Sequence, residues 1–321
     1  MMEYHLLAIF FAVLTDFIIG DPPKWPHPVK WIGSGISVLE KLLNQGKSRK
    51  SKGLLMVLLI STAAFLASIF LVWMCYLIHP GIGIAAEAII ISTTIAQKGL
   101  KQAALEVYVP LKSGNMAEAR RKLSYIVGRD TENLNEEEVV RGTVETVAEN
   151  ISDGVTAPLF WGIIGGAPFA IVYRAINTCD SMVGYKNEKY QDFGWASARL
   201  DDVVNWIPSR LTSYIILLGN KPACLTRWEA LRILFRDAKR HPSPNSGWLE
   251  AAIASLLGVQ LGGVNYYKGV ISNRAKMGEP IVRLEEAHII KTNRILTRTT
   301  ILFLLFIAMG GLLFELAKTW F

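Results

Sequence analysis

The sequence predicts an all-α, polytopic helical membrane protein with four or five full spans, a re-entrant helix pair and cytoplasmic helical segments. Hydrophobic residues make up 51% of the 321 residues, and the mean hydropathy is +0.30. A chain with these values is too apolar to be an ordinary soluble domain. Residues 54–78 form a stretch of 25 residues without a charge, long enough for a tilted helix across a hydrocarbon core of roughly 30 Å. Strand-like alternation is scarce along the chain, so we expect helices.

Further apolar segments on both sides of residues 54–78 complete the set of expected spans. Residues 4–20 are expected to be a retained first span, because they have neither a basic n-region nor a small-residue cleavage site. A Pro-Gly turn at 79–81 is followed by residues 82–96, which are expected to return across the membrane. Residues 299–314 form the last clear candidate.

Basic residues cluster between the apolar segments. They lie in 41–52, 221–240 and 268–298 and contribute to a net charge of +7. Beside membrane spans, the positive-inside rule and attraction to anionic lipid account for such clusters, and 41–52 is expected on the cytoplasmic side. Nucleic-acid binding is not expected, because no recognition fold accompanies the charge.

The first sizeable polar region covers residues 98–154. Within it, residues 115–127 and 135–149 mix apolar and charged positions as amphipathic helices do. Asn135 is followed by three glutamates. This pattern predicts a helix start, because Asn is a capping residue and acids in the first turn face the positive end of the helix dipole.

Two apolar segments after this region, 155–178 and 203–219, are broken by proline or glycine. Because irregular backbone at membrane depth is tolerated where protein or a water-filled cavity surrounds it, we expect a re-entrant pair that carries the polar loop 179–202 to the cytoplasmic side. The small, glycine-containing segment 250–264 suits close packing on other helices. No linker divides the chain, so residues 1–321 are expected to form a single domain.

The segment 177–202 is the strongest candidate site. Polar and ionisable groups beside membrane-embedded segments are costly and mark function by default; a polar loop between two helices is the alternative. Asp180, Asp201 and Asp202 offer carboxylates there, and Arg199 suits phosphate or carboxylate recognition. The three cysteines form no metal or redox motif, and neither common nucleotide-binding fingerprint is present.

Three further polar clusters adjoin apolar segments. Asp16 and Asp21 can share a pocket if the helix breaks between them, although interfacial acids at a helix end would explain each singly. Glu145 and Glu149 share a helix face, and paired carboxylates can bind Mg²⁺; a solvated acidic face is the alternative. Two prolines fix the loop 241–247, which could present backbone N–H groups to an anion, whereas its histidine alone would more often be structural.

Four motifs occur in order along the chain: Asp-Phe-Ile-Ile-Gly-Asp-Pro at 16–22 with His-Pro-Val at 27–29, Val-Glu-Thr-Val-Ala-Glu-Asn-Ile-Ser-Asp-Gly at 144–154, the segment 177–202, and His-Pro-Ser-Pro-Asn-Ser-Gly at 241–247. This set resembles the CbiB/CobD family of cobalamin biosynthesis, the adenosylcobinamide-phosphate synthases, over about residues 6–317. Cys179 stands where the family pattern has Leu, and Leu249 where it has Pro. Neither change removes an ionisable group.

The resemblance implies an ATP-dependent amide ligation. A carboxylate of the corrinoid adenosylcobyric acid would be joined to the amine of (R)-1-aminopropan-2-ol O-phosphate, giving adenosylcobinamide phosphate. Because a carboxylate does not condense with an amine in water unaided, ATP would form an acyl phosphate first, a step that needs Mg²⁺ and cationic donors around the phosphoryl group. The resemblance also implies a multi-pass protein of the cell (inner) membrane with its active site on the cytoplasmic side, near other membrane-bound enzymes of cobalamin assembly.

The clusters and the resemblance together give three sets of expected site residues. The catalytic set is Asp21, Asp180, Asp201, Asp202 and His241, in which His241 or Asp21 takes the amine proton. The Mg²⁺ set is Glu145, Glu149, Asp153, Asp180 and Asp202. The substrate- and phosphate-binding set is His27, Asn150, Asn177, Ser181, Tyr185, Lys186, Asn187, Arg199, Asn205, Arg210, Arg236, Ser243, Asn245 and Ser246.

Two other functions fit part of the pattern. A non-enzymatic AmpE-like membrane regulator would carry degraded versions of the motifs at 177–182 and 243–247, and here both are intact. A small-molecule transporter is suggested by Arg174 and Arg210 in the broken apolar segments, but it would be expected to show paired inverted halves, and no such symmetry is visible.

Overall fold

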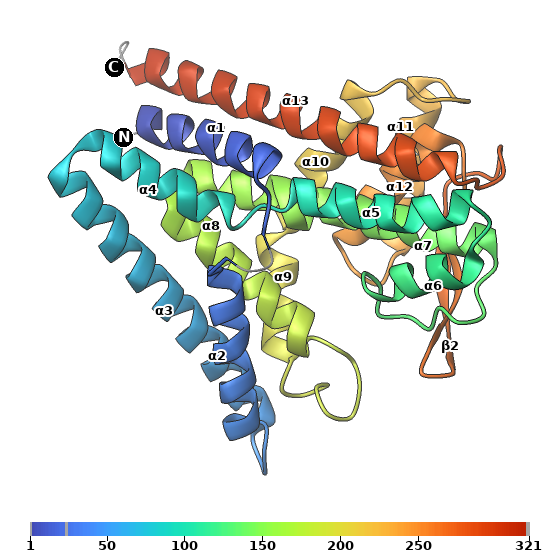
Figure 1. Cartoon of the computed structure of the whole chain (residues 1–321), viewed down its shortest axis with the longest axis horizontal. Helices are drawn as coiled ribbons and strands as arrows, with labels where there is room; N and C mark the ends of the chain where they lie inside the picture. The colour runs from blue at the N-terminus through green and yellow to red at the C-terminus, as the bar shows by residue number, and fades with distance from the viewer. Residues whose placement is uncertain (1, 23–24, 319–321) are drawn as a thin grey trace. The chain divides into compact units, whose positions relative to one another are not determined.

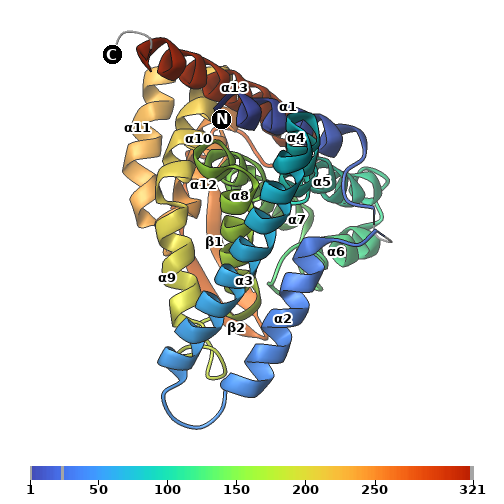
Figure 2. The ribbon, with the colours of Figure 1, turned by 90° about the vertical axis from the view of Figure 1, so that its left-hand side faces the viewer.

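The structure is a computed structural model that describes residues 2–22 and 25–318, and it is helical almost throughout (Figures 1 and 2). A π-helical turn, Ser152–Thr156, joins α7 to α8, and a 3₁₀ turn, Ala238–Arg240, follows α11. The helices are α1 (Met2–Ile18), α2 (Pro28–Leu43), α3 (Arg49–Ile78), α4 (Pro80–Ser92), α5 (Gln97–Lys112), α6 (Met116–Ser124), α7 (Glu136–Ile151), α8 (Ala157–Val183), α9 (Trp195–Val204), α10 (Trp206–Gly219), α11 (Arg227–Asp237), α12 (Ser246–Leu257) and α13 (Ala287–Lys318).

Four helical stretches of the described chain are long and apolar enough to cross a membrane. They are Arg49–Ile78, Pro80–Lys112, Glu136–Val183 and Ala287–Gly311. The predicted class of polytopic helical membrane protein is therefore confirmed. The segment 4–20 is also helical, as predicted, in the 17 residues of α1.

The chain divides into two compact units, each assembled from segments that are distant in sequence. Unit 1 comprises Met1–Ala96, Asp153–Asn205 and Leu304–Phe321, and unit 2 comprises Gln97–Ser152 and Trp206–Phe303. Each unit is described by itself below. That the whole chain acts as a single domain stays a prediction.

Unit 1 is a bundle in which α1 packs on α4, and α3 packs on α4, α8 and α9. Part of its core joins α2, α3 and α8 through Ile36, Met56 and Cys179, with Phe193 from the turn before α9. Gly53 lets α3 approach this turn, since a Cβ there would lie 1.8 Å from the carbonyl oxygen of Phe193. The contact depends on glycine.

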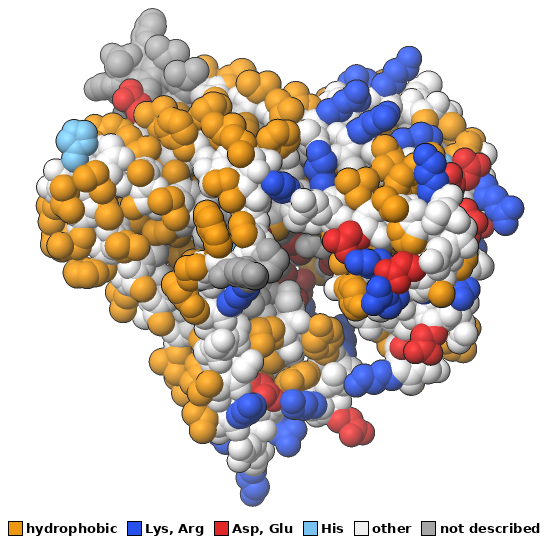
Figure 3. Space-filling view, in the orientation of Figure 1, with side chains coloured by type: hydrophobic (Ala, Val, Ile, Leu, Met, Phe, Trp, Pro, Cys, Tyr) orange, Lys and Arg blue, Asp and Glu red, His pale blue; other side chains and the backbone are white. Residues whose placement is uncertain are grey.

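The outer surface of unit 1 is strongly apolar. Figure 3 shows hydrophobic side chains covering the face formed by α1, α3 and α4. Phe10 on α1 and Phe70 on α3 are each more than half exposed, at 56% and 61%. An exposed apolar patch of this extent, which includes the charge-free residues 54–78 of α3, is expected to contact lipid.

Helix α8 is broken in its first half, as the glycines and prolines of 155–178 predicted. Gly165 and Gly166 leave helical geometry, with φ of −144° and +64°. The Ala167 N–H, freed by the break, donates to Oε1 of the buried Glu87 on α4 at 3.4 Å. Oε2 of Glu87 is bonded by His5 Nδ1 at 2.9 Å and by the Tyr76 hydroxyl at 3.1 Å. Four helices therefore meet at one buried carboxylate.

The prediction of a polar loop over 179–202 is wrong at both ends. Helix α8 continues to Val183, and α9 begins at Trp195, so only 184–194 connects them. The polar side chains do not break the helices because they face each other: Asn177 on α8 donates to Asp201 on α9 at 3.1 Å. Hydrogen bonding across two helices satisfies these groups without a loop.

Unit 2 surrounds α12, in which every residue from Ser246 to Leu257 is buried. Helix α12 packs on α7, α10 and α11, as expected for the small residues of 250–264. Helix α7 starts with the predicted cap. The side chain of Asn135 accepts the Glu138 amide, and the Glu138 carboxylate accepts the Asn135 amide, which completes a capping box.

The two-stranded antiparallel hairpin of unit 2, β1 (Leu261–Tyr267) and β2 (Val270–Met277), is visible in Figure 2. This hairpin was not expected from the sequence. Its start falls within 250–264, which was assigned wholly to helix packing. The hairpin is fixed from elsewhere in the chain: Asp130 accepts the amides of Lys268 and Gly269 at its turn, at 3.0 and 2.8 Å.

Candidate functional site

The predicted site residues fall mainly into two clusters, one in each unit. The acidic cluster of unit 1 consists of Asp153, Arg174, Asn177, Asp180, Asp201 and Asp202. The His241 cluster of unit 2 consists of Glu149, Ser209, Arg210, His241, Ser243, Asn245, Ser246 and Glu250. Each cluster is treated within its own unit.

Asp201 is the central group of the acidic cluster. It lies on α9, and its Oδ1 accepts the hydrogen bond from Nδ2 of Asn177. Burial, followed by the negative charge of Asp180, raises the pKa of Asp201 to about 7. Burial also raises the pKa of Asp202, against the attraction of nearby cations. Successive acids of one helix therefore hold protons more tightly than free carboxyl groups do.

A buried arginine that was not assigned to the site lies beside these acids. Nη1 of Arg174 donates to Oδ1 of Asn177 at 3.2 Å and to the carbonyl oxygen of Asp153 at 3.4 Å. Asp16 and Asp21 lie within its electrostatic reach, which brings both N-terminal acids to this cluster. The signal in the sequence was a lone arginine in an apolar segment, which marks function by default at membrane depth.

Asp21 and His27 form a pair at the start of α2. The distance between Nε2 of His27 and Oδ1 of Asp21 is 3.0 Å. Nδ1 of His27 accepts the Val29 N–H at 3.3 Å and caps α2. His27 therefore fixes the beginning of a helix, whatever contact it makes with a substrate.

Two cations approach the acidic cluster from its exposed side. Arg199 lies 3.7 Å from the carboxylate of Asp202, and Lys186 attracts the same carboxylate.

Asn205 is buried at the end of α9, and it accepts a hydrogen bond from the Tyr173 hydroxyl at 2.9 Å. The other predicted residues of this part of the chain are exposed: Ser181, Tyr185 and Asn187.

The loop of the His241 cluster is held by its own side chains. Nδ1 of His241 accepts the Ser243 amide at 3.0 Å, and Oγ of Ser243 accepts the amides of Asn245 and Ser246 at 3.3 and 3.2 Å. The Ser246 hydroxyl donates to Oε1 of Glu149 at 2.8 Å. The loop is therefore tied to α7 in one defined conformation.

Arg210 reaches the same loop from α10. Its Nη1 donates to Oδ1 of Asn245 at 3.2 Å, and Oδ1 also accepts from the Ser209 hydroxyl at 3.2 Å. Its guanidinium lies over the rings of Trp206 and Trp248, at 4.3 and 5.0 Å from their centroids. A guanidinium stacked in this way keeps a fixed plane and can present its edge to a phosphate or carboxylate.

His241 faces a buried acid that sequence reasoning missed. Nε2 of His241 lies 3.7 Å from Oε1 of Glu250. Burial lowers the pKa of His241. Burial and the charges of Glu145 and Glu149 raise the pKa of Glu250 well above its usual range. Burial therefore disfavours the charged form of both groups. An acid inside a helix that is otherwise apolar and small was the available signal.

Glu145 has a structural position in unit 2. Its carboxylate forms a buried ion pair with Arg129, and its Oε1 accepts the Gly262 amide at 2.8 Å.

Among residues 2–22 and 25–318, no group of three or more His, Cys, Asp or Glu side chains is arranged to hold a metal ion. The predicted set for Mg²⁺ is thus not assembled as one group in the described chain, and its metal role stays a prediction.

Two other predicted binding residues make local contacts. Arg236 is bidentate to Asp237, with both distances at 2.7 Å, and it also bonds Glu279. Most of its donors are therefore already engaged by acids. Nδ2 of Asn150 donates to the carbonyl oxygen of Thr146 within α7 at 2.9 Å.

Comparison with known proteins places the chain among cobalamin biosynthesis proteins. Residues 9–296 match the protein-family model described as CobD/Cbib protein. The cobalamin biosynthesis protein CobD of Halalkalibacterium halodurans is 51% identical over 98% of this chain and 100% of its own length. The CobD protein of Clostridium perfringens is 46% identical over 91% and 93%. The CbiB protein of Salmonella typhi is 42% identical over 94% and 97%. No solved structure matches.

Proposed function

The chain belongs to the CobD/CbiB family of cobalamin biosynthesis proteins, and we propose that it is the enzyme that joins adenosylcobyric acid to (R)-1-aminopropan-2-ol O-phosphate. ATP would transfer its terminal phosphoryl group to the corrinoid carboxylate, giving an acyl phosphate and ADP. The amine would then attack the acyl carbon, lose a proton and displace phosphate. The product is an amide, adenosylcobinamide phosphate.

The acidic cluster carries this proposal. An amine is protonated in neutral water and must lose a proton to become a nucleophile, so the reaction needs a base whose pKa lies near the working pH. The pKa of Asp201, raised to about 7 with burial as the largest cause, meets that need. Asp21 and His241 were expected in this role. However, Asp21 is paired with His27, and His241 is paired with the buried Glu250.

The same cluster fits a divalent cation. Mg²⁺ in phosphoryl-transfer sites takes one or two protein carboxylates and completes its shell with water and phosphate oxygens. Asp180 and Asp202, whose charges both act on the buried Asp201, are the residues that would hold it. Bound there, the ion would neutralise charge on the transferring phosphoryl group. Lys186 and Arg199 are the nearby cations for phosphate oxygens.

The surroundings expected for this reaction follow from its substrates. ATP is a cytosolic compound, so we place the active site on the cytoplasmic side of the cell membrane. The corrinoid is bulky and passes to later steps of cobalamin assembly, and membrane-bound enzymes of those steps are the partners we propose. No role for nucleic acid is proposed.

The test is an end-point assay on the purified, detergent-solubilised protein with ATP, Mg²⁺, adenosylcobyric acid and the amine, read by mass spectrometry of the corrinoid. The wild type should give the ATP-dependent amide. Asp180→Ala and Asp202→Ala should lower turnover by about 100-fold or more, as loss of electrostatic stabilisation of a transition state does. Asp192→Ala is the matched control, because Asp192 is a 57% exposed acid of the α8–α9 connection.

Two results would overturn the assignment at different levels. Full turnover in Asp180→Ala and Asp202→Ala, with folding verified, would remove the acidic cluster from the mechanism. No product from folded wild-type protein with any amine phosphate would favour the AmpE-like regulator instead.

A further inference from the structure

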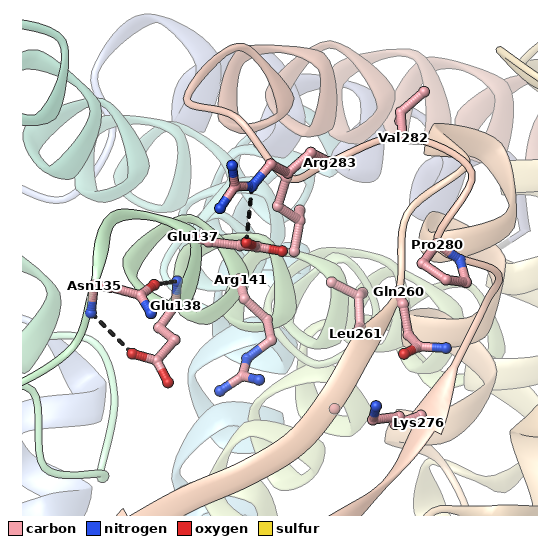
Figure 4. Close-up of a pocket in the computed structure, with 12 residues that line it drawn as sticks. Asn135, Glu137, Glu138, Arg141, Gln260, Leu261, Lys276, Pro280, Val282 and Arg283 are labelled. Atoms are coloured by element: carbon pink, nitrogen blue, oxygen red, sulfur yellow. Dashed lines mark hydrogen bonds and ion pairs between the residues drawn. The ribbon is translucent and has the colours of Figure 1, made fainter.

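Unit 2 contains a pocket that lies apart from the loop of the His241 cluster. Its volume is about 400 Å³, and it opens between the first turns of α7, the start of β1, the end of β2 and the segment that precedes α13 (Figure 4). Its lining is mostly polar and charged. The described residues that line it are Asn135, Glu137, Glu138, Arg141, Gln260, Leu261, Gly262, Lys276, Pro280, Val282, Arg283 and Leu284.

Two cations of the lining keep free donors. Nη2 of Arg141 donates to the Val264 carbonyl oxygen at 2.9 Å, but its Nε is buried without a hydrogen-bond acceptor among the described residues. The nearest carboxylate oxygen, Oε1 of Glu145, is 3.9 Å away. Lys276 is exposed and makes no ion pair within the described part of the chain. An anion in the pocket would give Lys276 a partner and would lie beside the Arg141 guanidinium.

The two acids of the lining, Glu137 and Glu138, have different partners. Glu137 pairs with Arg283 at 3.2 Å, so these two charges cancel. Glu138 uses Oε2 to accept the Asn135 amide at 2.8 Å, and its other oxygen has no hydrogen bond among the described residues. In the view of Figure 4, the Arg141 guanidinium lies between the Glu138 carboxylate and the Lys276 ammonium. The lining therefore offers both an anionic group, Glu138, and cationic groups, Arg141 and Lys276, to a ligand.

We propose that this pocket binds the amine substrate, a short aliphatic molecule with a phosphate at one end and an ammonium at the other. Arg141 and Lys276 would hold the phosphate, since both side chains suit phosphate oxygens, and Glu138 would hold the ammonium. This inference rests on the proposed function, because the ligation supplies a substrate with both charges. It concerns recognition of the amine and not the proton transfer assigned to Asp201.

The other two substrates fit the pocket poorly. A volume of about 400 Å³ suits a small molecule and excludes a corrinoid. None of the described lining residues is aromatic, so an adenine ring would find no stacking partner there. Glu138 would also repel a polyphosphate chain.

The experiment is titration calorimetry on the purified full chain in detergent, with (R)-1-aminopropan-2-ol O-phosphate, unphosphorylated aminopropanol and inorganic phosphate as separate probes. The wild type should bind the first compound most tightly. Lys276→Glu should weaken its binding by at least about 10-fold, the value of one charge-assisted hydrogen bond. Lys239→Glu, another exposed lysine of unit 2, is the matched control and should bind as the wild type does.

Glu138→Gln tests recognition of the ammonium end of the ligand separately from recognition of its phosphate end. Glutamine also completes a capping box, so α7 should keep its start while the negative charge is lost. This variant should lose most of the preference for the amine phosphate over inorganic phosphate. Unchanged affinities in both Lys276→Glu and Glu138→Gln would overturn the proposal, as would a wild type that binds inorganic phosphate equally well.

The ligation assay keeps this inference separate from the proposed function. If the wild type makes the amide and Lys276→Glu leaves the KM for the amine phosphate unchanged, the pocket assignment fails and the proposed function stands. If the wild type binds the amine phosphate in a Lys276-dependent manner and makes no amide with any corrinoid acid, the proposed function fails and the pocket is a binding site only.

Discussion

Asp201 illustrates how a single side chain can couple chemistry to pH. Its pKa of about 7, against an ordinary value of 3.8, means that the folded protein keeps this proton over a range in which the unfolded chain has lost it. The stability from this group is present in full below about pH 4 and is lost as the pH rises to about 7, by at most about 4 kcal/mol. Such a group is costly to the fold, and in the proposed ligation it would serve as the base.

Asp201→Asn should therefore raise thermal stability at pH 8 and have a much smaller effect at pH 4.5. Asparagine keeps an oxygen that can accept the Asn177 hydrogen bond and removes the charge that Asp180 repels. The measurement is the unfolding temperature of both proteins in detergent at the two pH values, with Asp192→Asn as the exposed control. An equal change at both pH values would show that Asp201 does not titrate in this window. The ligation assay should show lost turnover in the same variant.

Most members of the two candidate clusters could be predicted at the residue scale, but Arg174, Ser209 and Glu250 could not. Asn177 and Asp201 were assigned to one cluster, and the fold brings them into contact. Arg174 and Glu250 were not assigned, because each lies in a segment whose neighbours are apolar, and such segments predict burial and not chemistry. A charge that remains in an apolar helix is the more specific signal, since its burial must be offset by partners.

At the element scale, helix α8 depends on a side chain of another helix. Its break at Gly165 and Gly166 frees the Ala167 N–H, and Glu87 on α4 accepts it together with His5 and Tyr76. In lipid no water replaces a missing acceptor. The break is therefore stable only while this carboxylate is in place.

Glu87→Ala should lower the free energy of unfolding by several kcal/mol, because it leaves buried donors unsatisfied at roughly 1–3 kcal/mol each. Glu87→Gln should cost less, since an amide oxygen still accepts the Ala167 N–H. The measurement is unfolding of the purified protein by denaturing detergent, with Ile89→Ala as the control at a 63% exposed position of the same helix. Equal stability of Glu87→Ala and Ile89→Ala would show that the break is held by other contacts.

The elements that the sequence predicted best are those set by local rules. Helix α3 was predicted from a run of residues without charge, and the start of α7 was predicted from its capping residue and the acids that follow it. The hairpin β1–β2 follows from no local pattern of comparable strength. Its Asn265 is held by Arg129 and Arg141, more than 120 residues earlier in the chain, and contacts of this range cannot be read from a window of ten residues. The predicted loop 179–202 failed for the same reason.

At the scale of the whole molecule, the distribution of charge sets the orientation in the membrane. The connection between α2 and α3 is basic and exposed, with Lys47 in it and Lys50 in the first turn of α3. The turn between α3 and α4 carries only His79. Basic connections stay on the cytoplasmic side, because their transfer across the membrane is disfavoured. Helix α3 should therefore start inside the cell and end outside it.

Single cysteines at three exposed positions test this orientation, after the native Cys75, Cys179 and Cys224 are replaced by alanine. A membrane-impermeant maleimide should label Lys50→Cys and Lys268→Cys only in inside-out vesicles, and His79→Cys only in intact cells. Labelling of positions 50 and 268 from the inside is expected because basic residues surround both lysines. Labelling of position 79 from the outside is expected because α3 has 30 residues and spans about 45 Å at about 1.5 Å per residue. Labelling of positions 50 and 79 from one side would mean that α3 does not cross the bilayer. Labelling of position 268 from outside would place the proposed amine pocket away from cytosolic ATP and would contradict the ligation chemistry.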